Sequence, residues 1–314
     1  MRRYVVRRAA ATAATLCVVS VLIFVVVRVL PGDPALIIMG TEGSPEAAER
    51  LREALGLNHS LPVQYADWLA RAARGDLGVS IQYDVPVGRL IASRLPVTAP
   101  LALMAALLML ATALPLGLYA ATRHRRAGDY LAMVVSQLGI AIPSFWAGLL
   151  LILLFSVRLG WMRSGGFDGW SAGFWPGVTA LLLPAVALGL FQAAVLVRAT
   201  RSAVLDVLRE DYVRSARAKG VPEAVVIGKH TLRNALIPVV TVAGVQLGQL
   251  VAGSIILESV FALPGLGRLA LGAIGARDLP VVQGVTLFVA ALIVLINFAV
   301  DLLYGFLDPR IRYE

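Results

Sequence analysis

The segment DYVRSARAKGVPEAVVIGKHTLRNALIP, from Asp211 to Pro238, determines how the rest of the chain is interpreted. It is polar and basic, and it separates two long apolar runs. Its centre, Gly220-Val221-Pro222, interrupts helical structure, whereas both flanks favour helices. A short charged segment between two apolar runs predicts a structured loop that leaves a membrane and contacts a partner.

Composition indicates a membrane protein with several spans. Of the 314 residues, 59% are hydrophobic and only 15% are charged, which is unusual for a soluble domain. The net charge of +9 is expected from basic loops beside a membrane rather than from nucleic-acid binding. Cys17 is the only cysteine, which excludes an intrachain disulfide, and the three histidines match no metal-binding spacing.

Six apolar runs are long enough to cross a bilayer. A hydrocarbon core of roughly 30 Å requires about 20 helical residues. We therefore predict an all-α polytopic membrane protein with six transmembrane helices. The runs lie at about 9–30, 96–121, 130–157, 177–198, 235–257 and 281–304.

Basic residues gather on one side of these spans. They are dense in the N-terminus (1–8), the loop between the second and third spans, the loop 199–234 and the tail 306–314. The positive-inside rule predicts that both termini and these loops are cytoplasmic. Segment 31–95 is then external, with helices expected at Pro45–Leu55 and Gln64–Ala73. The remaining spans form a predicted helical core at 96–305.

The sequence contains no recognisable catalytic motif. Its Gly228-Lys229 pair lacks the rest of a phosphate-binding loop, and neither H-E-x-x-H nor G-x-S-x-G occurs. We expect the chain to be no enzyme and to bind no cofactor or metal itself. Ion-coupled carriers typically need a carboxylate or a broken helix near the membrane centre. Because Glu258 and Asp301 fall near predicted span ends, energy for transport is expected from another subunit.

Polar side chains within the predicted spans are candidates for a translocation pathway, because polar groups are unfavourable against lipid. Hydrogen bonding between helices is the alternative explanation for each. Gln246, Gln249 and Gly253 share one helical face, beside a Gly244-x-x-x-Gly248 strip that suits close helix packing. The pathway candidates are Gln137, Ser144, Gln192, Gln246, Gln249 and Asn297.

The basic segment is expected to form a helix-turn-helix elbow. Gly220 suits the end of the first helix, Pro222 the first turn of the second, and Glu223 its positive dipole end. A solvated basic loop is the alternative. The first helix is expected from apolar residues at helical spacing, namely Leu205, Leu208, Tyr212 and Ala216.

This segment resembles the cytoplasmic coupling loop of ABC-transporter permease subunits, the EAA loop, whose pattern is E-A-A-x3-G-x9-I-x-L-P. Gly220 takes the glycine position, Ala216 the second alanine and His230 the isoleucine. Arg214 and Ser215 depart from the pattern, as is typical of the dipeptide/oligopeptide branch. The resemblance implies an ATPase-coupling set of Arg214, Ser215, Ala216, Arg217, Ala218, Lys219, Gly220, Glu223 and His230.

The resemblance covers nearly the whole chain and implies the type I ABC importer permease fold. The long segment after the first span is similar to that of the B-type member of the permease pair. The short motifs that carry the resemblance are Leu30-Pro31-Gly32-Asp33-Pro34, Gly75-Asp76-Leu77-Gly78-x-Ser80, Arg94-Leu95-Pro96-x-Thr98, Ile142-Pro143-Ser144-Phe145-Trp146, Glu258-x-x-Phe261-x-x-Pro264-Gly265-Leu266-Gly267 and Asp308-Pro309-Arg310.

The resemblance implies a permease subunit in the bacterial cytoplasmic membrane that imports peptides or related small solutes by alternating access. It implies a heterodimer with a C-type permease, two cytoplasmic ATPases that bind ATP and Mg, and an external solute-binding protein. Related permeases also serve glutathione, nickel chelates or sugars. Two other classes are the alternatives: an ion-gradient-coupled secondary transporter, and a structural membrane protein that moves nothing.

Overall fold

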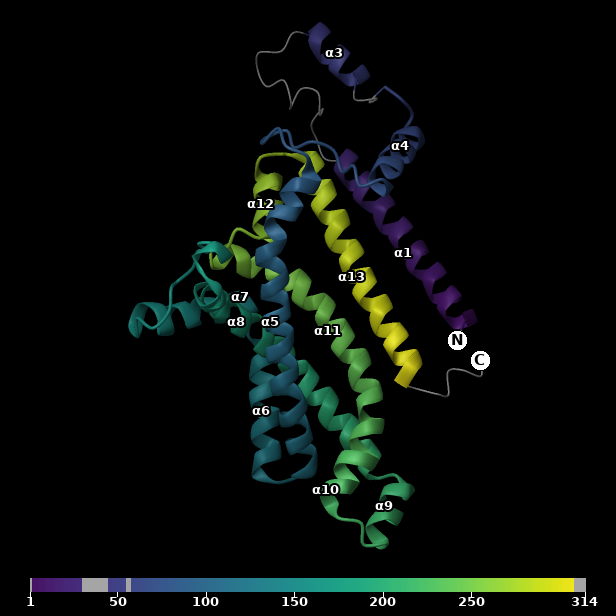
Figure 1. Cartoon of the computed structure of the whole chain (residues 1–314), viewed down its shortest axis with the longest axis vertical. Coiled ribbons are helices and arrows are strands. Elements are labelled where there is room, and N and C mark those ends of the chain that lie inside the picture. Colours follow the sequence, from purple (N-terminus) through teal and green to yellow (C-terminus); the bar gives the residue numbers. More distant parts are fainter. Residues whose placement is uncertain (1, 30–44, 55–57, 308–314) are drawn as a thin grey trace.

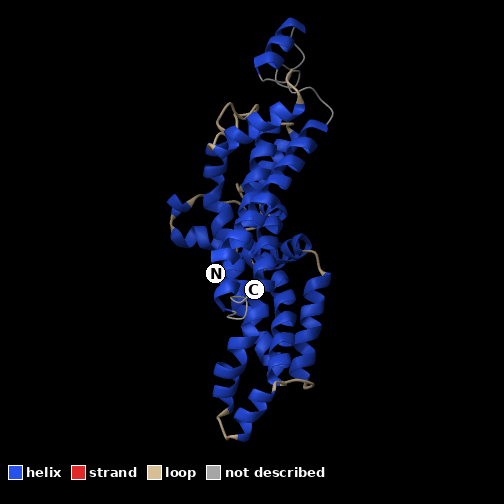
Figure 2. Ribbon diagram, turned by 90° about the vertical axis from the view of Figure 1, so that its right-hand side faces the viewer, coloured by secondary structure: helices blue, strands red, loops and turns tan. Residues whose placement is uncertain are grey.

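The structure, a computed structural model, describes residues 2–29, 45–54 and 58–307 (Figure 1). Within these ranges the chain is helical and contains no strand, only an isolated bridge between Val79 and Pro86 (Figure 2). The predicted all-α class is confirmed. Two of the resemblance motifs, at 30–34 and 308–310, lie outside the described residues, as does the last residue of the helix expected at 45–55.

Five described helices are long and apolar enough to cross a membrane, and a bent helix pair brings the number up to six. The long helices are α1 (Arg2–Val29), α5 (Val87–Thr122), α8 (Phe174–Leu208), α11 (Arg233–Val260) and α13 (Leu279–Leu307). The shorter ones are α3 (Pro45–Ala54), α4 (Leu61–Ala73), α6 (Ala127–Ala141), α7 (Ser144–Leu151), α9 (Asp211–Ala218), α10 (Glu223–Val225) and α12 (Leu266–Gly275).

The third predicted span is not one continuous helix. The run expected at 130–157 divides into α6 and α7, and the two directions differ by 101°. Ile142 takes extended backbone between them, because the ring of Pro143 disfavours helical geometry in the residue before it. A π-helical turn at Ile152–Arg158 then continues α7. Pro143 was the available signal for this break.

The helices form an elongated bundle (Figure 1). Helix α5 packs along α8, α11 packs between α8 and α13, and α1 lies on the outer side of α13. Helices α3 and α4 lie at one end of the molecule, and α9 and α10 lie at the opposite end. Leu101 of α5, Leu188 of α8 and Leu250 of α11 belong to one buried cluster that joins the three central helices. The core therefore fixes the relative positions of both ends.

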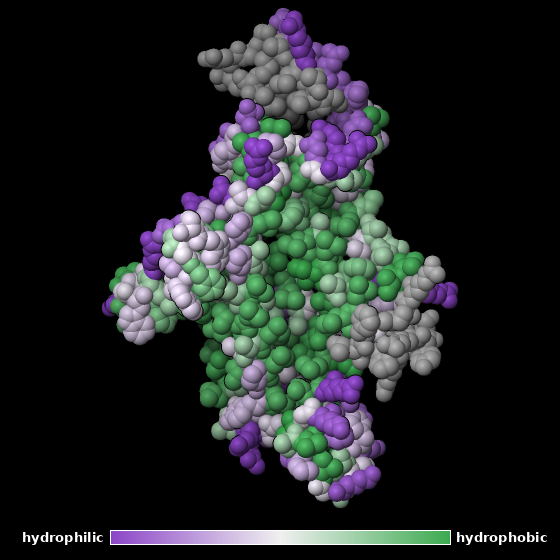
Figure 3. All heavy atoms as spheres, viewed as in Figure 1, coloured by the Kyte–Doolittle hydropathy of each residue, from purple (hydrophilic) through white to green (hydrophobic). Residues whose placement is uncertain are grey.

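The outer surface of the bundle is apolar around its middle. Figure 3 shows hydrophobic side chains across the central spans and hydrophilic side chains gathered at the two ends. Many large apolar residues on these spans are exposed, including Leu22, Leu103, Leu131 and Leu295. Soluble monomers rarely expose so many large apolar side chains together. They suit contact with lipid or with other transmembrane helices.

The small-residue strip of α11 packs closely, as predicted. A Cβ atom placed on Gly244 would lie 2.4 Å from Val300, and one on Gly248 would lie 3.3 Å from Ile293. Both contacts are with α13, so the strip brings these two helices together.

Asp301, expected near a span end, joins the two terminal helices. Its carboxylate pairs with Arg8 of α1, and its backbone oxygen accepts a 3.0 Å hydrogen bond from the Tyr4 hydroxyl. The contacts hold the start of α1 against the end of α13. This carboxylate is therefore part of a helix contact.

Candidate functional site

The turn of the predicted elbow is closed by Gly220. Its φ of +74° lies in the left-handed region that favours glycine. Its N–H donates to Arg217 O at 2.9 Å, and the N–H of Val221 donates to Ala216 O at 3.2 Å. This pair of bonds is a Schellman motif, which satisfies carbonyls left free at the end of α9. The predicted capping role of Gly220 is thus observed.

A small apolar core holds the two arms of the elbow together. Val213 and Ala216 of α9 pack against Val226, all three are buried, and Val221 covers them from the turn. Burying these side chains gives the elbow a fixed angle that a solvated loop would lack.

An ion pair closes the elbow on its exposed side. The Arg217 guanidinium donates to the Glu223 carboxylate at 2.7 Å, and this hydrogen bond raises the pKa of Arg217 above its usual value. Both side chains are more than one third exposed, so the pair contributes at most about 1 kcal/mol. The apolar core is therefore the main constraint on the angle.

The second arm of the elbow continues directly into α11. From Glu223 to Val260 the chain is one unbroken helical stretch of 38 residues, with a π-helical turn at Val226–Leu232. Pro222 precedes this stretch with extended backbone instead of lying in its first turn as predicted. The second arm of the elbow and α11 are therefore one continuous element.

Polar contacts also tie the first arm to the base of α11. Asn234 Nδ2 donates to the Tyr212 hydroxyl at 2.7 Å, and that hydroxyl donates to His230 O at 3.3 Å. Both arms of the elbow are thus connected to α11.

The first arm is shorter than predicted. Helix α8 ends at Leu208, and Glu210 takes extended backbone before α9 begins at Asp211. The periodic set from Leu205 to Ala216 therefore belongs to two helices, not to one approach helix. The acidic side chain of Asp211 favours a new helix start at this point.

The predicted coupling residues divide into two groups. Ala216 is buried in the elbow core and His230 is half-buried. The others form a solvent-facing surface around the turn: Arg214, Ser215, Arg217, Ala218, Lys219, Gly220 and Glu223.

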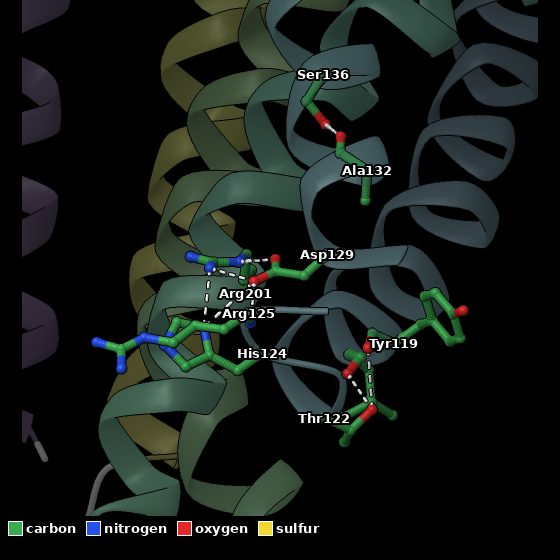
Figure 4. A network of polar contacts seen from close by, with 9 residues as sticks. Tyr119, Thr122, His124, Arg125, Asp129, Ala132, Ser136 and Arg201 are labelled. Carbon is green, nitrogen blue, oxygen red and sulfur yellow. Dashed lines mark hydrogen bonds and ion pairs between the residues drawn. The ribbon is translucent and has the colours of Figure 1, made fainter. Parts of the chain in front are cut away.

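An ion pair that was not predicted joins the α5–α6 turn to α8, with the Asp129 carboxylate buried and the Arg201 guanidinium partly buried (Figure 4). Asp129, at the start of α6, accepts from Arg201 of α8 through two bonds of 2.5 and 2.7 Å. It also accepts from the backbone N–H of Arg125 at 3.0 Å. His124 Nδ1 lies 3.1 Å from Arg201 Nη2. This pair, named here the Asp129–Arg201 clamp, fixes the α5–α6 turn to α8 ten residues before α9 begins.

The sequence held a weak signal for this clamp. Asp129 is the one acid in the basic loop that contains Arg123, Arg125 and Arg126. It stands immediately before an apolar run, where only a paired carboxylate is expected to be buried. Its partner lies 72 residues away, so local pattern could not identify the pair.

The predicted pathway residues do not gather at one surface. Gln246 is buried, whereas Gln249 on the same predicted face is exposed, as is Asn297 of α13. Gln137 is also exposed and accepts a 3.0 Å hydrogen bond from Arg198 of α8. This contact is hydrogen bonding between helices, the alternative to a pathway role. Ser144 and Gln192 are half-buried on α7 and α8.

Comparison with known families identifies the chain. Residues 113–313 match the family described as "Binding-protein-dependent transport system inner membrane component", and residues 1–102 match the corresponding N-terminal family. The chain belongs to this permease family. The predicted resemblance is confirmed.

Known relatives align with this permease along its whole length. It is 44% identical over 314 residues, covering 100% of both chains, to a Brucella abortus (strain 2308) protein whose name assigns it to a peptide transport system as a permease. It is 43% identical, with the same coverage, to the glutathione transport system permease protein GsiC of Escherichia coli (strain K12).

A solved structure shares the fold of this permease. A chain of the inward-facing MetNI methionine ABC transporter matches it with a TM-score of 0.56 and 21% identity, covering 70% of this permease and 96% of that chain. The type I importer permease fold expected from the sequence is thus supported by a known importer.

These findings establish the general function. The chain is a permease subunit of an ATP-driven importer and a multi-pass protein of the bacterial inner membrane. Family membership implies ATPase and substrate-binding partners. The alternative of an ion-gradient-coupled carrier, and that of a structural protein, are not supported.

Two resemblance motifs of the permease meet around a buried acid that was expected near a span end. Glu258 is fully buried. It accepts from the Thr98 hydroxyl at 2.6 Å and from Gly267 N–H at 2.6 Å. The Thr98 oxygen in turn accepts from Leu266 N–H at 2.9 Å. Glu258 therefore holds the start of α12 against α5.

Proposed function

We propose that this permease imports peptides or glutathione-like solutes by alternating access. Support for the substrate class comes from relatives that span the full length and carry peptide and glutathione transport names. Proteoliposomes of the assembled importer, supplied with its binding protein, would accumulate labelled trialanine or labelled glutathione. Failure to accumulate either solute would contradict this substrate class and leave the permease assignment intact.

The elbow at 211–234 is the proposed coupling site to an ATPase. The observation that carries this proposal is the continuity between a capped, apolar-cored elbow and the 38-residue helical stretch that includes α11. A docking surface that must transmit force requires a rigid connection to the element that it moves. Closure of the ATPases would push the elbow, and α11 would move with it.

The proposed assembly is a heterodimer with a C-type permease, two cytoplasmic ATPases and an external solute-binding protein, all at the lipid bilayer. ATP and Mg would bind to the ATPases, and this chain would carry no catalytic site or cofactor. Both termini and the elbow would be cytoplasmic, since the dense basic clusters favour that side. No nucleic-acid partner is proposed.

The translocation pathway is proposed to include some of the polar residues within the spans. Among the candidates, Ser144 follows the break between α6 and α7. Gln192 lies on α8, the central helix against which α5, α6 and α11 pack. These two half-buried positions suit a pathway better than Gln137, because its side chain already bonds to Arg198.

Substituting proline for Gly220 is expected to reduce uptake strongly. Proline fixes φ near about −65° and lacks an N–H, whereas this position has φ +74° and donates to Arg217 O. The Schellman motif would be lost and the two arms would separate. Transport by the reconstituted importer is expected to fall at least tenfold while the ATPases still hydrolyse ATP.

Asparagine at the same position is the matched control. Asparagine adopts left-handed backbone more readily than other non-glycine residues, and a Cβ atom on Gly220 would meet nothing within 4 Å. Gly220→Asn should therefore retain most uptake. Normal solute uptake by the proline variant would disprove the coupling role of the elbow.

A further inference from the structure

A cavity of about 350 Å³ lies between the start of α5 and helix α12. Two basic side chains, Arg94 and Arg268, line it together with Tyr83, and none of its lining residues is acidic. The rest of the lining is apolar or glycine, namely Pro264, Gly265, Leu269, Leu271 and Gly272. The cavity thus concentrates positive charge in partly apolar surroundings.

The two arginines have spare hydrogen-bonding capacity. Arg94 Nε is buried and has no hydrogen-bond partner among the described residues. Arg268 donates through Nη1 to Ala262 O at 2.9 Å. In the described part of the chain, no carboxylate forms an ion pair with either guanidinium.

A buried acid beside the cavity is directed elsewhere. Glu258 lies directly behind the cavity wall, since a Cβ atom on Gly265 would come within 2.2 Å of its carboxyl carbon. Its oxygens accept from the Thr98 hydroxyl and from the N–H groups of Gly267 and Arg268. The Glu258 oxygens therefore bond to these groups, and the carboxylate forms no ion pair with the Arg94 or Arg268 guanidinium.

The chemistry of the cavity favours a carboxylate ligand. A guanidinium presents a planar fork of N–H donors that matches the two oxygens of a carboxylate. Two guanidinium groups that line one cavity without a carboxylate between them repel each other. A single carboxylate between them relieves this repulsion.

We propose that this cavity receives an Asp or Glu side chain of the external solute-binding protein. The cavity lies between α12 and the start of α5. These two elements are at the end of the bundle opposite α9 and α10 (Figure 1). This inference rests on the proposed orientation, in which that end is external. None of the polar pathway candidates lines the cavity, which favours a docked protein over the transported solute. Tyr83, 49% exposed, stands at its edge.

The test uses the complete importer in nanodiscs, titrated with its solute-loaded binding protein. The concentration that gives half-maximal stimulation of ATP hydrolysis is measured. Arg94→Gln and Arg268→Gln should each raise it about tenfold, equivalent to about 1.4 kcal/mol, and leave the maximal rate unchanged. Arg94→Lys should give a smaller increase, because it keeps the charge but loses the fork.

Arg89→Gln is the matched control. Arg89 is an exposed arginine near the start of α5, the helix that carries Arg94. It does not line the cavity. The control should shift half-saturation less than twofold. The proposal would be overturned if Arg89→Gln raised the half-maximal concentration of binding protein as much as both cavity variants do. It would also be overturned if the cavity variants changed the KM for the solute but left the half-maximal concentration of binding protein unchanged. Arg268 is exposed, so its variant remains informative if Arg94→Gln fails to assemble.

A charge exchange would identify the partner residue. Arg94→Glu should abolish stimulation, and replacing one acidic residue of the binding protein with arginine should restore it. If no such acidic position restores stimulation, the docking role is refuted.

Orientation is checked separately with Gln82→Cys in a Cys17→Ser background, using a membrane-impermeant maleimide. Labelling from the cytoplasmic side alone would overturn the proposal through its orientation.

Discussion

Replacing Asp129 with alanine is expected to reduce solute uptake at least tenfold while ATP hydrolysis by the complex continues. The change leaves the Arg201 guanidinium without its carboxylate in partly buried surroundings. Removing one partner of such a pair destabilises a protein by about 3 kcal/mol. Because the clamp holds the α5–α6 turn to α8, the helix that leads into the elbow, its loss should uncouple elbow movement from α5 and α6. The measurement is the ratio of solute imported to ATP hydrolysed.

A double-mutant cycle separates this role from general destabilisation. Arg201→Gln alone should reproduce the defect, and combining it with Asp129→Ala should add little, because the two residues act through one interaction. Asp206 is an exposed acid on α8, the helix that carries Arg201. The Asp206→Ala variant is the control and should transport normally. Fully additive losses, or an unchanged transport-to-hydrolysis ratio in Asp129→Ala, would argue against the clamp.

Placing valine at position 267 is expected to prevent stable assembly of the permease. A Cβ atom on Gly267 would lie 2.2 Å from the Cα of Ile255 in α11, and backbone atoms cannot move aside as a flexible side chain can. Relief requires α12 to shift, which breaks the bond from Gly267 N–H to Glu258. The loss should reach at least about 3 kcal/mol, the upper end of the range for overpacking. It would be measured as the folded yield and melting temperature of the detergent-purified importer.

Gly275→Ala provides the comparison within the same helix. Gly275 is exposed at the end of α12, and a Cβ atom there meets nothing within 4 Å. Alanine should leave the melting temperature unchanged or raise it slightly, because it favours helix. A stable Gly267→Val importer would mean that α12 does not pack against α11 at this distance.

The sequence predicted most of the elbow because its determinants are local. Gly220 and Pro222 act through their own backbone geometry, and the helical flanks follow from residue spacing. The exception, the break at Arg209-Glu210, separates two helices whose apolar residues keep the same periodicity. Spacing alone therefore predicted one helix.

The pathway candidates illustrate the opposite case. Gln246 and Gln249 share a face by helical geometry, yet one is buried and the other exposed. Burial depends on which neighbouring helix covers each turn, and helix spacing carries no information about the neighbour. The same reasoning explains why the pairing of Asp129 with Arg201 could not be predicted.

The sequence by itself determined the helical class, the apolar spans and the capped turn at Gly220, because hydrophobicity and backbone preference act over a few residues. Only the tertiary structure decided that Asp129 meets Arg201, that Thr98 and Glu258 position α12, and that Arg94 and Arg268 line one cavity. These contacts join residues between 72 and 174 positions apart in the chain. The packing of whole helices brings them together.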